Sequence, residues 1–264
     1  RRFFSQATAE VLGSEIAIRF NREEHESYFV AGVASALGES EDRVNPSIED
    51  GLLMSIGARL TVGEGILAGV TGGNRVILAA EHSGLLGGDF EFTHVSGILD
   101  LRAETFARRR FIPNTLDVRL AAGATVGDLP IQRTALVEGS AAFIEPVYFS
   151  KFGSLRTLEH RAYQGDRYVG VFWEHSFRSL PFELIGWKWA ARQGYGIIVH
   201  GAHARTWLSE RLQDEMGYPG AAPDSFHHEI GISVSGIFGL FRIDATRRLD
   251  EPGFTMGIGV ARIL

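Results

Sequence analysis

The chain has 264 residues, enough for one large β domain or two small ones, and 45% of them are hydrophobic, which excludes an intrinsically disordered chain. No run approaches the roughly 18 consecutive apolar residues of a transmembrane helix, and the net charge of −6 gives no general affinity for nucleic acid. Cysteine is absent, which excludes disulfides, zinc–thiolate sites and thiol catalysis.

The chain begins RRFFSQATAE, without an initiator methionine or an apolar signal region. A removed signal peptide would explain this beginning, as would a position downstream in a longer protein. We favour the second explanation and expect an N-terminal part to be missing.

Alternation of apolar and polar residues with period two recurs along the chain and predicts β-strands. The clearest stretches are SEIAIRF at 14–20, GILDLRAET at 97–105, TLDVRLAAG at 115–123, HHEIGISVSG at 227–236, GLFRIDATRRL at 239–249 and GFTMGIGVARIL at 253–264. The sequence therefore predicts an all-β protein, with roughly four to six strands in the first 110 residues and about eleven or twelve in total.

The stretch GLFRIDATRRL places Arg242 and Asp244 on one face of a strand and apolar residues on the other. In a soluble β-sandwich the charged face would meet water, whereas in a membrane barrel the apolar face meets lipid and the charged face lines a wet lumen. Strands of about 9–11 residues, the length needed to cross a membrane, favour the barrel, because soluble strands average about 5–6 residues. Charges of both signs on the polar faces, and the absence of predicted helices between strands, favour it too.

The predicted connections alternate in length, as they do in outer-membrane barrels. Segment 206–225 is long and polar, 237–239 and 249–253 are short, and 125–164 is an excursion of about 40 residues without clear strands. Aromatic residues near predicted strand ends suggest an interfacial girdle: Phe90, Phe92, Phe111, Trp173, Phe177, Trp187, Trp189 and Trp207. A soluble β-rich binding protein instead predicts that a second sheet covers the face carrying Leu116, Val118 and Leu120.

No motif predicts catalysis, a metal site or a cofactor. His200 and His203 are three apart on a predicted strand and point to opposite faces, as do the adjacent Glu174 and His175. In GISVSG at 231–236, Ser235 stands where the G-x-S-x-G motif of a nucleophile elbow has its second glycine, and no strand-to-helix turn is predicted there. We therefore predict a protein that is not an enzyme and has no catalytic, metal-ligating or cofactor-binding residues.

From residue 114 onward the order of features resembles the barrel of the BamA/TamA superfamily, also called bacterial surface antigens. The quoted matches are TLDVRLAAGATVGDLP at 115–130, FGSLRTLEHRAYQGDRY at 152–168, DRYVGVFWEHSF at 166–177, and the closing trio HEIGISVSG, FGLFRIDATRRL and FTMGIGVARIL. The match looks closest to a Bacteroidota-type branch, whose members often carry a carboxypeptidase-regulatory-like domain upstream. In this chain Thr157 and Leu158 replace the glycine and aromatic residue of the loop motif, and Leu264 replaces the usual final aromatic residue.

The resemblance implies that residues 1–264 form the C-terminal part of a sixteen-stranded antiparallel transmembrane β-barrel in the bacterial outer membrane. It implies that the excursion 125–164 folds toward the lumen, where Arg156 meets acidic residues of the late strands, with Asp244 or Glu229 as the partner. Alternatively, Arg156 lies on a solvated loop, and Asp244 pairs with Arg242 or Arg119.

In that family the seam between the first and last strands is where client strands engage. Gly257 and Gly259 would make the last strand flexible there, although glycine on a crowded lumen face fits equally well. The implied function is non-enzymatic assistance in inserting or translocating proteins, with membrane lipids and nascent outer-membrane or surface proteins as partners. The alternative is a passive pore, or the anchoring barrel of a surface enzyme such as a patatin-type lipase.

Overall fold

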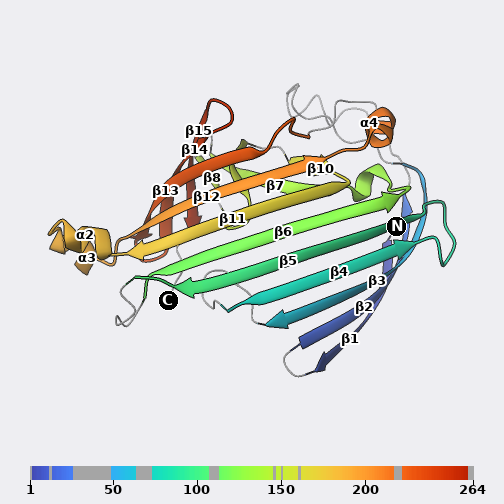
Figure 1. Ribbon diagram of the computed structural model, residues 1–264, viewed down its shortest axis with the longest axis horizontal. Coiled ribbons are helices and arrows are strands. Elements are labelled where there is room, and N and C mark those ends of the chain that lie inside the picture. The colour runs from blue at the N-terminus through green and yellow to red at the C-terminus, as the bar shows by residue number, and fades with distance from the viewer. Residues whose placement is uncertain are drawn as a thin grey trace.

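The computed structural model describes residues 2–11, 14–25, 49–63, 73–106, 113–144, 147–149, 151–159, 162–216 and 222–260. This part of the chain is all-β and is built on one large, mostly antiparallel sheet (Figure 1). Its long strands are β1 (Arg2–Val11), β2 (Ser14–His25), β3 (Gly51–Gly63), β4 (Arg75–Ser83), β5 (Phe92–Glu104), β6 (Thr115–Gly127), β11 (Arg167–Arg178), β12 (Gly196–Trp207), β13 (His227–Ile237), β14 (Phe241–Arg248) and β15 (Gly253–Val260).

These eleven strands lie in chain order across the sheet, each antiparallel to the next, with β6 next to β11. Five of them precede residue 110, as expected, but the described residues hold fifteen strands in all, more than the eleven or twelve expected, because the region between β6 and β11 adds four. The sheet does not close within the described residues, because β1 forms one edge and the other side of β15 pairs with a short strand, β8. The predicted pairing of first and last strands across a seam is therefore not present in this structure.

The excursion between β6 and β11 differs from its prediction in bounds and content. β6 continues through Gly127, so the excursion is 128–166 rather than 125–164. It is not free of strands: it contains the 3₁₀ helix η1 (Ile131–Arg133), the ten-residue strand β7 (Ala135–Ile144) and the short strands β8 (Val147–Phe149), β9 (Leu155–Glu159) and β10 (Ala162–Gly165). The sequence of β7, ALVEGSAAFI, has no regular alternation. The three other strands are too short to show one, and each of them pairs with β7.

The excursion lies against one face of the large sheet, which we call the inner face. Val137, Leu155 and Leu158 of the excursion form an apolar cluster with Phe172 of β11 and Ala202 of β12. β9 also contacts β13, β14 and β15. The excursion thus packs against the inner face of the late strands.

Burial on the two faces is the reverse of that in a soluble protein. On β14, Asp244 is fully buried on the inner face while its neighbour Ile243 is 43% exposed on the outer face. On β13, Ser233 is buried while Ile232 is 50% exposed. Leu120 of β6 is 39% exposed, and among the described residues no second sheet of the kind that a soluble sandwich needs covers this face. The alternation in the sequence predicted two faces correctly, and the structure shows that the apolar one is outside.

Short helices interrupt the strand order, contrary to the expectation of strands alone. α2 (Leu180–Leu184) and α3 (Lys188–Arg192) connect β11 to β12, and α4 (Glu210–Met216) connects β12 to β13. In the described part of the chain, no helix is long and apolar enough to cross a membrane.

A second apolar cluster joins the strand ends to α4 and η1. Leu208, just before α4, and Leu212 of α4 pack against Leu129 and Ile131 of the excursion. Phe90 and Phe92, predicted as girdle residues, are buried in this same cluster, so that prediction was wrong for them. Phe111 lies outside the described residues. Trp173 lies in the middle of β11 and not at a strand end.

Candidate functional site

Five charged residues meet on the inner face of the late strands, and we call them the inner-face charge cluster: Arg156, Glu174, Glu229, Arg242 and Asp244. They come from β9, β11, β13 and β14, and each is at most 5% exposed. Two guanidinium groups therefore share a confined space with three carboxylates. Buried charges of this kind are tolerated only when they are paired and hydrogen-bonded.

Arg156 is the member that the excursion contributes. Its Nη2 donates to Glu174 Oε1, and its Nη1 lies 3.8 Å from Asp244 Oδ1. Its backbone N–H donates to Glu229 Oε1 at 2.8 Å. Both partners proposed from the sequence, Asp244 and Glu229, thus contact Arg156, and Glu174 is a third that the sequence reading did not name.

Arg242 completes the pairing on the wall of the sheet. It donates through Nη1 and Nη2 to the two oxygens of Glu174, at 3.0 and 2.8 Å. Its Nε lies 3.2 Å from Asp244 Oδ1. This paired geometry suits the planar guanidinium, which matches a carboxylate bidentately. Arg119 takes no part, because it pairs with Asp100 at 2.6 Å.

The Glu229 carboxylate accepts hydrogen bonds from both the backbone and a side chain of the excursion. The backbone N–H of Thr157 donates to Glu229 Oε2 at 2.9 Å, and the Thr157 hydroxyl donates to the same oxygen at 2.8 Å. The hydroxyl also lies 2.8 Å from Nε2 of the buried His227. The Thr157 hydroxyl therefore joins the excursion to two residues of β13.

His200 extends the cluster along β12. Its ring lies 3.1 Å from Ser233 Oγ and 3.0 Å from Thr246 Oγ1, and Ser233 Oγ in turn donates to Asp244. Gly231 makes this position of the ring possible, because a Cβ there would lie 2.3 Å from His200 Nε2. His203, three residues on, lies on the outer face beside His228, so the two strand histidines do diverge as predicted.

Gly257 and Gly259 of β15 lie on the inner face, opposite Asp244 and Arg242 of β14. A residue without a side chain leaves room for the large charged groups beside it. Along its other side, β15 pairs with β8 in parallel over the three residues Met256, Gly257 and Ile258. Both glycines therefore border the charge cluster, and Gly257 also lies in the pairing with β8.

A second arginine joins the excursion to the early strands. Arg133 of η1 pairs with Glu81 of β4 and lies 3.5 Å from Glu23 of β2. A cavity of about 590 Å³ lies between the excursion and β4–β6 and β11, and another of about 350 Å³ lies against β1–β4; Arg133 borders both. The excursion is thus joined by ion pairs both to the early strands β2 and β4 and to the late strands β11 and β14.

Two carboxyl groups outside the strands have shifted pKa values. Burial and the nearby Glu215 raise the pKa of Glu49 to about 6. Burial acts to raise the pKa of Asp250, but hydrogen bonds from Arg248 and the His228 N–H outweigh it and hold the pKa at about 2. Both groups lie at the end of the sheet where the excursion begins and ends.

The chemistry of the inner-face charge cluster is that of a structural contact. Each carboxylate is engaged by arginine, backbone N–H or hydroxyl donors, and no described group of three His, Asp or Glu residues is arranged to hold a metal ion. The sequence reading missed Glu174 because it compared that residue only with the adjacent His175. The sequence did contain a sign of this role. In the alternating strand DRYVGVFWEHSF, Glu174 falls on the face that the predicted loop arginine was expected to meet.

No protein-family model matches the chain, and no curated protein matches its sequence.

Proposed function

We propose that the protein is a β-barrel of the bacterial outer membrane that assists the insertion or translocation of other proteins, without enzymatic activity. The observation that carries this proposal is the reversed burial of the sheet: charged residues on the inner face and apolar residues on the outer face. Burying charge while exposing Ile, Val and Phe is unfavourable in water, and it is the pattern of a sheet whose outer face meets lipid.

Aromatic residues on the outer face support this orientation, because they gather near both ends of the strands. At one end, Phe106 stacks on Phe177, with ring centroids 6.3 Å apart. At the other end, Trp207 and Phe226 contact each other at 6.2 Å, and Arg205 lies over the Trp207 ring. Aromatic rings at two levels, with an apolar band between them, match the interfacial girdles of membrane barrels.

The inner-face charge cluster has a mechanical role in this proposal. Arg156 joins the excursion to three strands of the wall, so the excursion stays in the lumen as one unit with the late strands. An excursion held this way occupies the space that an open pore would need. The proposal therefore favours an assembly or translocation role over a passive channel.

In this proposal, the side of β15 that faces β8 is where another strand would pair. Unpaired backbone N–H and C=O groups at a sheet edge accept an added strand, which brings affinity through main-chain hydrogen bonds. β8 pairs with β15 over three residues, which is short beside the eight residues of β15 itself. A client strand would displace β8 and then extend along the rest of the edge.

The barrel is tested by electrophoresis of detergent-purified protein with and without heating. Wild type is compared with Arg156→Ala and Asp244→Ala, and with Lys151→Ala, which removes an exposed ion pair of the same excursion. We expect a heat-modifiable β-rich species whose melting temperature falls in both cluster variants and stays unchanged in Lys151→Ala. A chain that is monodisperse without detergent, with no heat-modifiable form, rules the barrel out.

The assembly role is tested in proteoliposomes with a urea-denatured outer-membrane barrel as the client. We expect the client to reach its folded, heat-modifiable form faster than in liposomes without the protein. Steady ion conductance with no acceleration of client folding would replace the assembly role with that of a pore.

A further inference from the structure

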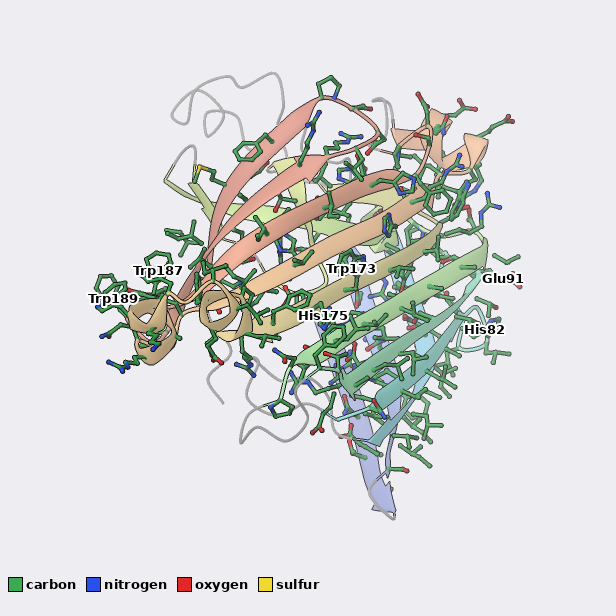
Figure 2. All side chains as sticks on the ribbon, turned by 60° about the vertical axis from the view of Figure 1, so that its left-hand side comes forward. His82, Glu91, Trp173, His175, Trp187 and Trp189 are labelled. Atoms are coloured by element: carbon green, nitrogen blue, oxygen red, sulfur yellow. The ribbon has the colours of Figure 1, made fainter. Side chains whose placement is uncertain are left out.

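The connection between β11 and β12 exposes large apolar side chains at one tip of the molecule. Leu184 and Ile185 are 78% and 73% exposed, and Trp187 and Trp189 are 51% and 56% exposed. Figure 1 shows α2 and α3 beyond the ends of β11 and β12, and Figure 2 shows Trp187 and Trp189 on this tip, at the opposite end of the molecule from Glu91. Four neighbouring apolar residues that meet water are costly unless something covers them.

This helical hairpin is built to hold its tryptophans in place. Phe182 and Ala190 are buried between the two helices, and Phe182 packs edge-on against Trp187 at 5.5 Å. Gly186, with φ of 76°, makes the tight reversal between α2 and α3. The Trp187 N–H donates to the Phe182 carbonyl at 2.8 Å across that reversal. The exposure of the tryptophans is thus a fixed feature of a small folded unit.

Basic residues alternate with the tryptophans. Lys188 lies between Trp187 and Trp189, and Arg192 follows on α3; both are exposed. The hairpin has one acidic residue, Glu183, which accepts a hydrogen bond from Ser179. Indole rings combined with long basic side chains are typical of the region where lipid headgroups meet acyl chains, because both groups have an apolar body and a polar tip.

The surface around the hairpin continues the same character. Phe238, in the β13–β14 turn at the same end of the strands, is 90% exposed, and Leu240 beside it is 45% exposed. His175 and Phe177 face outward at the end of β11, with ring centroids 4.1 Å apart. The hairpin is therefore contiguous with the apolar outer face and its aromatic level.

We propose that the α2–α3 hairpin is a membrane-interface anchor that inserts Trp187, Trp189, Leu184 and Ile185 into the headgroup–acyl boundary of the leaflet at that end of the barrel. The proposal rests on the membrane location given under Proposed function and adds a specific lipid contact to it. Lys188 and Arg192 then extend toward anionic headgroup phosphates, which fixes how deeply this end of the barrel lies. A connection longer than a tight turn is useful at this end because it carries the side chains that set the depth.

The test uses single-tryptophan variants, because Trp173 in the middle of β11 provides an internal reference for depth (Figure 2). Three variants retain only Trp173, only Trp187 or only Trp189, with phenylalanine at the other positions. Each is checked for heat-modifiable migration and reconstituted in bilayers whose acyl chains are brominated either near the headgroups or near the bilayer centre. Bromine quenches indole fluorescence on contact.

We expect shallow bromines to cause the larger fractional loss of fluorescence in the Trp187 and Trp189 variants, and deep bromines to cause the larger loss in the Trp173 variant. Quenching of Trp173 with none at Trp187 and Trp189 overturns the anchor and leaves the barrel in place. Absence of quenching at all three positions overturns the membrane location itself. Repeating the Trp189 measurement with Lys188→Gln and Arg192→Gln in anionic bilayers should reduce shallow quenching; unchanged quenching removes the headgroup contact from the proposal.

Discussion

At the scale of single residues, Glu174 is the carboxylate that Arg156 and Arg242 share. Removing the Glu174 charge leaves two positively charged guanidinium groups close together, with one negative charge fewer to balance them. Breaking a buried ion pair by removing one partner costs about 3–5 kcal/mol in proteins. Replacing an exposed partner costs about 0–1 kcal/mol.

Glu174→Gln is therefore expected to destabilise the protein by several times more than Glu138→Gln. Glu138 is a matched control, because it also pairs with a basic residue but is 57% exposed. The measurement is the urea midpoint of the heat-modifiable form in one detergent. Equal midpoints for the two variants would mean that water in the lumen screens the cluster as well as it screens the surface.

The alternation of GLFRIDATRRL was enough to predict that Arg242 and Asp244 lie on the same face of their strand. Arg156 was named as a candidate partner from the family resemblance and not from this alternation. It was not enough to find Thr157 or His227, because their contacts depend on how the excursion folds back across β13. Sequence periodicity reports the face of a residue along its own strand. It carries no information about which distant segment lies above that face.

At the scale of elements, α4 is held at the end of the sheet by apolar packing and by a small charged group. Leu212 is buried against Ile131 of η1, while Glu215 lies near Glu49. The pKa of Glu49 is raised from 4.5 to about 6, so the folded protein holds this proton more tightly than the unfolded chain does. Its contribution to stability is therefore present below about pH 4.5 and is lost as the pH rises through about 6.

We expect the backbone amides of α4 to lose protection against hydrogen exchange between pH 4.5 and pH 7. The same amides in Glu49→Gln should show little change, because glutamine does not titrate. Comparing the two proteins at each pH cancels the intrinsic effect of pH on exchange. A wild type that changes no more than Glu49→Gln contradicts the assignment.

The last three strands could be predicted from the sequence, whereas the short elements could not. β13, β14 and β15 have alternation over eight or more residues, and they were found with almost correct bounds. α2 and α3 have five residues each, fewer than two helical turns, so they show no helical period. β8 has three residues and is defined by its partner β15, which no local pattern reports.

At the scale of the whole molecule, the reversed burial predicts that the cost of a charged substitution on the outer face depends on its depth in the bilayer. Ile232 lies in the middle of β13 on the outer face, and Phe241 lies at the start of β14 on the same face. Arginine on a lipid-facing strand costs about 2–4 kcal/mol at the bilayer midplane and about 0–1 kcal/mol near the interface.

We therefore expect Ile232→Arg to destabilise the protein in bilayers by clearly more than Phe241→Arg. The measurement is the free energy of unfolding in vesicles of defined lipid. Similar costs for both variants would show that the outer face does not span a gradient from hydrocarbon to water.

The exposed apolar face also determines which positions of this protein are free to vary. Lipid chains are fluid and conform to any side chain, so the outer positions of β13 and β14 should accept Leu, Ile, Val, Phe or Met interchangeably, without the volume matching that a solid core demands. The inner positions should tolerate almost nothing, because each charge there depends on several others. In a saturation mutagenesis experiment, the apolar outer positions should tolerate substitution and the charged inner positions should not. In a water-soluble enzyme the buried apolar positions are the intolerant ones, and charged surface positions tolerate substitution.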